Sequence, residues 1–359
     1  MKKRMAISIA TCLLIVLAIG LTGCSGITDF FDGLSTLSAP EVTVIGNTLI
    51  WDSVKGAKEY EVYKDDNLVS TVGATNYSSV DNDKTAQFYV VAVSKNGKKK
   101  SDPSKKVAVY KQTGFTEEET MNITLESGVY VIPSNISYAV VTGSSDNATI
   151  SIADRTTNLV LELNSVNITS VQGKGCITTN DGTYDSQKYR FSVTLVVKGI
   201  NVLKGSAINS MPNKPSNNSQ KKGSTGYNGV DAIVLPTIAI TGDGSLTCTG
   251  GKGGKGGQGS DSSGSIFSGS LASPGNGGDG GTGGYGIATT KLVMAMEATG
   301  TVNAYGGEGG QEGMYGVNGN VSTGFWNNVL DTLKKGEKGK DGESMVGDIL
   351  QIGGIFTGQ

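Results

Sequence analysis

The sequence predicts an all-β protein in which a small antiparallel β-sandwich precedes a glycine-rich β-solenoid. Two observations support this fold class. Short runs of alternating apolar and polar residues, separated by turn residues, fill residues 38 to 110 and are typical of sandwich strands. Further along, a sequence unit recurs, and half of the 54 glycines lie between residues 242 and 320, which is typical of a repeat architecture.

The first 23 residues have the layout of a bacterial export signal. The basic start MKKR is followed by an uncharged, mostly apolar stretch from Met5 to Gly23. Its end, Leu21-Thr22-Gly23-Cys24, resembles the lipobox of bacterial lipoproteins, whose cysteine accepts a diacylglycerol before cleavage. An uncleaved transmembrane helix is the alternative, because a bilayer span takes about 20 residues. We expect lipidation at Cys24 and a membrane-anchored protein that faces away from the cytoplasm.

Composition and charge exclude several function classes. The formal net charge of −2 becomes more negative when Lys2, Lys3 and Arg4 leave with the signal, so nothing indicates a nucleic-acid partner. The sequence has no histidine, which excludes Ser/His/Asp and Cys/His catalysis and the commonest zinc ligands. No cofactor is expected; calcium binding is left open, although no motif supports it.

The order of these features divides the chain into six parts. We predict a signal peptide at 1–23, a tether at 24–37, a β-sandwich at 38–110, a linker at 111–120, a glycine-rich solenoid at 121–320 and a C-terminal cap or tail at 321–359.

Several landmarks of the sandwich resemble a fibronectin type III domain. Pro40 precedes the first strand, Trp51 lies in the second, EYEVYK forms the third, and FYVVAVSKNG leads into the last. The resemblance implies a spacer or a protein-binding module, since this fold alone implies no activity. Trp51 is predicted to fill the sandwich core, with sugar stacking as the alternative.

The solenoid prediction depends on internal repeats. Gly242 to Gly254 aligns without gaps over Ala298 to Gly310, and a small residue before isoleucine recurs at Cys176-Ile177, Ala232-Ile233 and Gly286-Ile287. Each unit is too short to bury its own apolar face. We therefore expect the units to stack as rungs around one continuous core.

Three stretches carry a resemblance to a known family: NLVLELNSVNITSVQGKGCI, VTLVVKGINVLKGSAI and ITGDGSLTCTGGKGG. They resemble the rungs of bacterial right-handed β-helix proteins of the clostridial cellulose- and pectin-binding type. The resemblance spans about residues 121 to 320. It implies a right-handed β-helix and a polysaccharide partner.

The repeats also assign the two cysteines of the folded part. Cys248 aligns with Ala304, and Cys176 stands where other copies have Ala or Gly. We predict that both are small core residues. A disulfide between them is the alternative.

Glycine dominates three runs, at 250–259, 277–286 and 306–310, in which two residues of every three are glycine. Such a pattern leaves two sides of a threefold extended helix bare, so the runs could pack backbone against backbone. A flexible low-complexity loop is the alternative.

The segment FWNNVLDTLKK near the C-terminus has the apolar spacing of a helix. It places Phe325, Val329, Leu330 and Leu333 on one face. We predict a cap, because a solenoid needs its open end covered. A helix that binds a partner is the alternative.

The predicted function is display of a polysaccharide-binding solenoid at the cell surface, without enzymatic activity. Exposed aromatic rings would stack on sugars. The tyrosines that lie near predicted rung edges are the candidate binding residues: Tyr184, Tyr189, Tyr227, Tyr285 and Tyr305.

Two alternatives to this function remain. The first is a structural or adhesive surface protein that binds a protein partner. The second is a β-helix polysaccharide lyase, for which Arg155 and Arg190 are the candidate bases. Its acids lack paired-carboxylate or metal-ligand spacing: Asp181, Asp185 and Asp231.

Overall fold

The computed structural model describes residues 36–79, 82–208, 221–261, 274–295, 299–315, 337–338, 340–351 and 354–358. Cys24 and the predicted helix around Phe325 lie outside the described residues. The chain forms two compact units, one built mainly from Leu49–Tyr77 and Ala86–Ala108, the other mainly from residue 109 onward. Within the described part, no helix is long and apolar enough to span a membrane.

The first unit is the predicted β-sandwich. Its core contains Trp51, whose ring lies edge-on to Tyr60 at 5.4 Å between centroids, together with the fully buried Phe88. This burial confirms the core role predicted for Trp51. The strands form two sheets: β1 (Val42–Ile45), β2 (Thr48–Trp51) and β5 (Asn76–Ser78) in one, and β4 (Asn67–Val72), β3 (Ala57–Lys64), β6 (Ala86–Ser94) and β7 (Val107–Val109) in the other.

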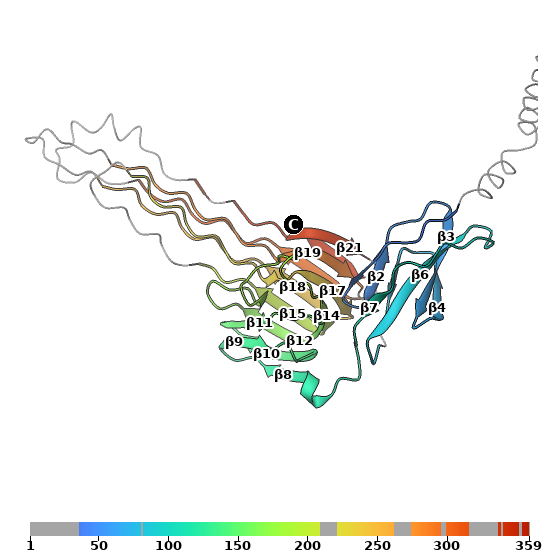
Figure 1. Ribbon diagram of the computed structural model, residues 1–359. Coiled ribbons are helices and arrows are strands. Elements are labelled where there is room, and N and C mark those ends of the chain that lie inside the picture. Colours follow the sequence, from blue (N-terminus) through green and yellow to red (C-terminus); the bar gives the residue numbers. More distant parts are fainter. Residues whose placement is uncertain are drawn as a thin grey trace, which may run out of the picture. The chain divides into compact units, whose positions relative to one another are not determined.

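The second unit begins with the short 3-10 helix η1 (Glu117–Glu119) and continues as a curled, parallel sheet of 15 strands (Figure 1). The strands of this sheet form three ladders. The first ladder contains β8 (Thr120–Thr124), β10 (Tyr138–Ser145), β12 (Leu159–Thr169), β14 (Val193–Lys198), β17 (Thr237–Gly242), β19 (Ile287–Met294) and β21 (Met345–Gln351).

The other two ladders complete each turn. One joins β9 (Gly128–Ile132), β11 (Ala148–Ile152), β13 (Ile177–Thr179), β16 (Ile233–Val234) and the start of β19. The other joins the end of β12, β15 (Ile200–Lys204), β18 (Ser245–Thr249), β20 (Thr301–Tyr305) and β22 (Ile355–Gly358). This parallel, curled sheet confirms the predicted fold class, a sandwich followed by a β-helix.

Inward-facing side chains at matching positions of successive strands form columns, and these columns make up the solenoid core. Leu161 pairs with Leu195, which pairs with Ile240, and all three are fully buried. In the third ladder, Cys248 lies between Leu203 and Ala304 in the same manner. Each rung thus contributes its inward side chains to one continuous cluster, because no single rung has enough apolar surface for a core of its own.

The cysteines are small core residues, as predicted. Both Cys176 and Cys248 are fully buried free thiols, so the disulfide alternative is not formed. Burial raises the pKa of the Cys176 thiol to about 12 and also raises that of Cys248. Neither thiol has the low pKa and the exposure that reactive cysteines need.

The C-terminal segment differs from the expectation of a cap or tail at 321–359. β21 extends the first ladder beside β19, and β22 extends the third beside β20. The solenoid therefore continues to residue 358 rather than ending at 320. The recurring side-chain pattern stops before the backbone pairing stops. A sequence shows only the side-chain pattern, so the last strands could not be recognised from it.

The glycine runs are ordered and pack backbone against backbone. We call the set of residues 221–230, 250–261, 274–286, 306–315 and 337–342, as far as they are described, the glycine bundle (Figure 1). Backbone hydrogen bonds join each segment to the next. Gly254 N–H donates to the Tyr227 carbonyl at 2.7 Å, and the Gly254 carbonyl accepts from Gly281 N–H at 2.8 Å. The Gly281 carbonyl in turn accepts from Gly310 N–H at 2.7 Å. The flexible-loop alternative does not apply to these described segments.

Glycine is required in the bundle because neighbouring backbone segments lie too close together for a side chain, and not because of an unusual backbone angle. The bundle glycines are not among the residues with a φ in the left-handed region. A Cβ on Gly281 would collide with the Tyr227 carbonyl, and one on Gly226 with the Gly254 carbonyl. The third residue of each triplet points outward and can be charged, as in the Lys252–Glu308 ion pair of 2.7 Å. The two-in-three pattern agrees with hydrogen bonds between segments that recur at every third residue, as from Gly251, Gly254 and Gly257.

Substitution of a bundle glycine should therefore destabilise the second unit. We expect Gly281→Ala to lower its free energy of unfolding by about 1–3 kcal/mol, the range for overpacking a close-packed site. Thr282→Ala is the matched control, because Thr282 is exposed at the outward position of the same triplet. Chemical denaturation of both variants measures the difference, and equal stability would show that the backbones do not pack this closely.

Candidate functional site

A hollow of about 490 Å³ opens on the outer side of the first ladder. We call it the Tyr138 hollow. Its lining combines the segment before η1 with outward-facing residues of five neighbouring strands: Gln112, Thr113, Gly114 and Phe115 from the segment, and Thr120, Tyr138, Val160, Glu162, Thr194, Val196 and Thr241 from β8, β10, β12, β14 and β17. Asn47, which belongs to the same compact unit, also lines it.

Strand register places these side chains together. Residues two apart on a strand share one face, so Val160 and Glu162 both point outward from β12. In the parallel register, Tyr138 pairs with Val160, and Val160 pairs with Thr194. Glu162 pairs with Val196 in the same way. Residues separated by more than twenty positions in the chain thus line one surface.

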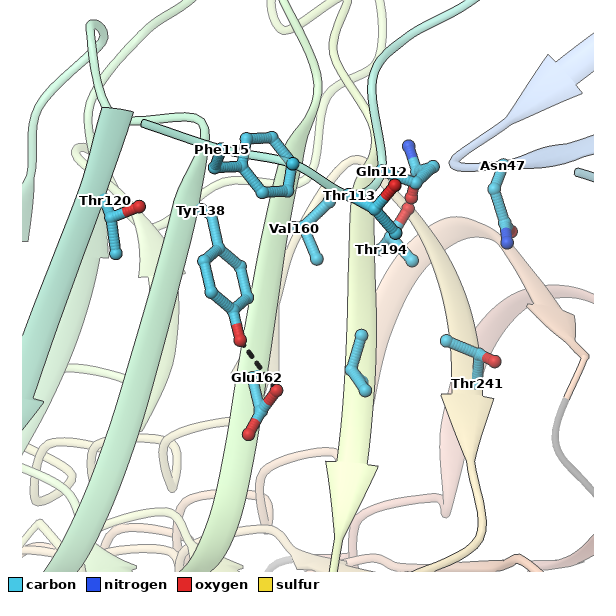
Figure 2. Close-up of a pocket in the computed structure, with 12 residues that line it drawn as sticks. Asn47, Gln112, Thr113, Phe115, Thr120, Tyr138, Val160, Glu162, Thr194 and Thr241 are labelled. Carbon is cyan, nitrogen blue, oxygen red and sulfur yellow. Dashed lines mark hydrogen bonds between the residues drawn. The ribbon is translucent and has the colours of Figure 1, made fainter. Parts of the chain in front are cut away.

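An aromatic pair forms one wall of the hollow. The rings of Phe115 and Tyr138 stack with 5.2 Å between centroids and 12° between planes (Figure 2). Lys111 Nζ lies 5.3 Å from the Phe115 centroid and 2.9 Å from a carboxylate oxygen of Glu119. Because Phe115 precedes η1 while Tyr138 begins β10, the linker as well as the solenoid builds this wall.

A carboxylate lies at the end of the Tyr138 ring. Tyr138 Oη donates to Glu162 Oε2 at 2.8 Å, as Figure 2 shows, and Lys198 Nζ lies 2.9 Å from the same oxygen. Glu162 is only 7% exposed. Burial, together with this hydrogen bond to the carboxylate, raises the pKa of Tyr138 to about 12. Among the described lining residues, Glu162 is the one charged group.

The arrangement suits binding of a hydroxyl-rich ligand. The aromatic pair and two valines supply apolar surface, while threonine hydroxyls and the Glu162 carboxylate supply hydrogen-bonding groups. Pockets that bind small molecules combine a largely apolar lining with a few oriented polar groups, in volumes of about 300–1,000 Å³. The Tyr138 hollow falls within that description.

The five tyrosines predicted to bind sugar do not line this hollow. Tyr189 is 3% exposed and lies edge-on to Phe191, at 6.0 Å between centroids, within the solenoid core. Its ring face is therefore not available to a ligand, which corrects the surface role expected for it. The sequence placed it in an insertion, but the insertion folds back onto the rungs.

The other four tyrosines lie on separate elements, and their role stays a prediction. Tyr227 is 53% exposed on the glycine bundle, which also carries the half-buried Tyr285. Tyr184 is half-buried in the loop after β13. Tyr305 ends β20 beside Thr249 of β18.

Two of the residues considered for lyase chemistry, Arg155 and Asp185, have structural partners. Arg155 is 5% exposed, and its Nη2 donates to the carbonyls of Pro133 at 2.7 Å and Ile136 at 2.6 Å. Desolvation lowers its pKa to about 10. Arg190 is exposed, and Asp185 Oδ1 accepts the Gln187 N–H of a turn at 2.8 Å.

Two of the three acids share a second hollow. Asp181 and Asp231 line a space of about 330 Å³ beside Thr178, Asn180 and Lys174. Asp231 Oδ1 accepts the Tyr285 N–H at 2.7 Å, and burial raises the pKa of this carboxyl. The described residues contain no group of three side chains of the metal-ligating kind.

Two of the solved structures that align with this chain show what it is similar to. No protein-family model and no curated protein sequence matches this chain. The family 28 exopolygalacturonase of Yersinia enterocolitica aligns with 90% of this chain and 86% of its own, at 7% identity and a TM-score of 0.31. A structure named FN3tt mut aligns with 21% of this chain and 93% of its own, at 25% identity and a TM-score of 0.16.

The first of these structures corrects one expectation. The sequence predicted a protein without enzymatic activity, yet the structure that aligns with most of this chain is an exopolygalacturonase by name. The prediction that the chain is not an enzyme is therefore withdrawn. Assays on this protein need to measure cleavage of polysaccharide as well as binding.

The hydrogen bond between Tyr138 and Glu162 gives a test of the hollow in solution. The folded state favours neutral Tyr138, so its contribution to stability is complete below the ordinary tyrosine pKa of about 10 and is lost as the pH rises through about 12. We expect the difference between the tyrosinate absorbance titrations of the native protein and Tyr138→Phe to show one group that ionises near pH 12. A difference centred near the ordinary tyrosine pKa would contradict the described geometry.

Proposed function

We propose that this chain is a lipid-anchored surface protein outside the cytoplasm whose β-solenoid binds polysaccharide in the Tyr138 hollow. The observation that carries the proposal is the stacked pair of Phe115 and Tyr138 beside the buried Glu162 carboxylate. A sugar ring offers an apolar face and a rim of hydroxyls. The aromatic wall fits the face, and the carboxylate accepts hydrogen bonds from the rim.

The extent of the hollow supports a polymer rather than a single sugar. Its lining reaches across five neighbouring strands, from Thr120 on β8 to Thr241 on β17. At roughly 4.7–4.9 Å per strand, this is about 19 Å. That length accommodates several sugar units in a row.

Removal of one ring should weaken glycan binding. We expect Phe115→Ala to lower retention of the protein on insoluble cellulose, polygalacturonate or peptidoglycan, whichever binds, by about tenfold, which corresponds to about 1.4 kcal/mol. Tyr227→Ala is the control, because Tyr227 is an exposed aromatic residue outside the hollow. Melting curves of both variants check the fold, and release of reducing ends or unsaturated products is recorded in the same samples.

Three outcomes of this experiment differ in meaning. Retention by none of the glycans would disprove the binding function. Loss of retention in Tyr227→Ala with normal retention of Phe115→Ala would move the site to the glycine bundle. Product release that Phe115→Ala abolishes would assign cleavage as well as binding to the hollow.

The lipid anchor has its own test. In a bacterial host, we expect the protein to incorporate labelled fatty acid and to fractionate with membranes, because two acyl chains anchor a protein stably. Cys24→Ser removes the acceptor thiol, so the label should be lost and cleavage of the signal blocked. Unlabelled native protein that keeps its first 23 residues would instead favour the transmembrane alternative.

A further inference from the structure

The charges at the Tyr138 hollow are already paired with one another. Lys198 Nζ contacts the Glu162 carboxylate at 2.9 Å, and that carboxylate also accepts a hydrogen bond from the Tyr138 hydroxyl. Lys111, above the Phe115 ring, contacts Glu119 at 2.9 Å. Two cations and two carboxylates thus balance around the hollow.

The remaining lining offers no group for an anion. Apart from Glu162, the described lining residues carry hydroxyl, amide, aromatic and aliphatic side chains, or none in the case of Gly114. Recognition of a carboxylate in a protein site usually depends on an arginine or lysine that is free to pair with it. An arginine is missing from the described lining, and both nearby lysines are engaged.

A polyuronate would therefore bind at a cost. Each sugar of such a chain brings one carboxylate, which loses its hydration when it enters the hollow and gains no cation in exchange. It would also approach Glu162, a like charge. A neutral polysaccharide loses no ionic hydration, and its hydroxyls can donate to Glu162 and exchange hydrogen bonds with the threonines.

We propose that the Tyr138 hollow selects neutral polysaccharide against polyuronates, and that the Glu162–Lys198 pair sets this selectivity. The inference rests on the proposed function, since it names the class of polysaccharide that the hollow takes. Glu162 is the specificity-determining residue, because its negative charge both neutralises Lys198 and repels an acidic chain.

Binding of the full chain to two soluble polymers tests this selectivity. Hydroxyethylcellulose is the neutral probe and polygalacturonate the acidic one, each measured at about 50 and 500 mM NaCl, where screening lengths differ severalfold. We expect hydroxyethylcellulose to bind at least tenfold more tightly than polygalacturonate at low salt. The affinity for hydroxyethylcellulose should change less than twofold between the two salt concentrations, because this polymer forms no ion pair with the protein.

Two variants of the ion pair isolate the cause. In Glu162→Gln, the amide oxygen can still accept the hydrogen bond from Tyr138, but Lys198 loses its partner. We expect polygalacturonate affinity to rise about tenfold at low salt and to fall again at high salt. Hydroxyethylcellulose should instead bind more weakly, because its hydroxyls lose a charged hydrogen-bond acceptor. Lys198→Met removes the cation that neutralises Glu162, so binding of polygalacturonate should weaken further.

The outcomes separate this inference from the proposed function. If the native protein binds polygalacturonate as tightly as hydroxyethylcellulose, and Phe115→Ala weakens both, the hollow binds glycan but the inferred selectivity is wrong. A polygalacturonate affinity that does not rise in Glu162→Gln would also overturn it, because the pairing of Lys198 with Glu162 would then not set the selectivity. Binding of neither polymer, nor of the insoluble glycans, would disprove the proposed function itself.

Discussion

Parallel hydrogen bonding between consecutive rungs determines where every side chain of the second unit lies. Each strand repeats the register of the one before it, so inward positions form columns such as Leu161, Leu195 and Ile240. The same register aligns the outward positions that form the Tyr138 hollow. A change of register by one residue would exchange the two sets, which is why burial of one face specifies the pairing so strongly.

The glycine bundle extends this constraint to segments without a side-chain core. Its segments run outside the sheet but belong to the same unit, and their hydrogen bonds recur every three residues, for example from Gly251, Gly254 and Gly257. Where a rung buries alternate side chains, the bundle buries backbone, so the pattern changes from a period of two to a period of three. Cross-segment ion pairs on its surface are exposed and contribute little to stability.

The Tyr138 hollow uses positions that the repeat leaves free. Its outward positions are free to vary because the core depends only on inward ones. Tyr138 and Glu162 use two such positions on adjacent strands, and Phe115 adds a ring from the segment before the first rung. The solenoid supplies a rigid surface, and the site is composed of residues that the repeat does not require.

The sequence by itself determined the fold class and the core roles of Trp51, Cys176 and Cys248, whereas it left the glycine runs open between backbone packing and a flexible loop. Each of these depends on local period or on aligned copies, which a chain displays directly. Only the tertiary structure decided the site. Tyr138 lies in the run SYAVVTG and Glu162 in LVLELN, where apolar residues on both faces hide which side points outward. Their contact depends on pairing between strands, as does the burial of Tyr189 and the extension of the sheet by β21 and β22, and pairing across distant segments leaves no mark in local pattern.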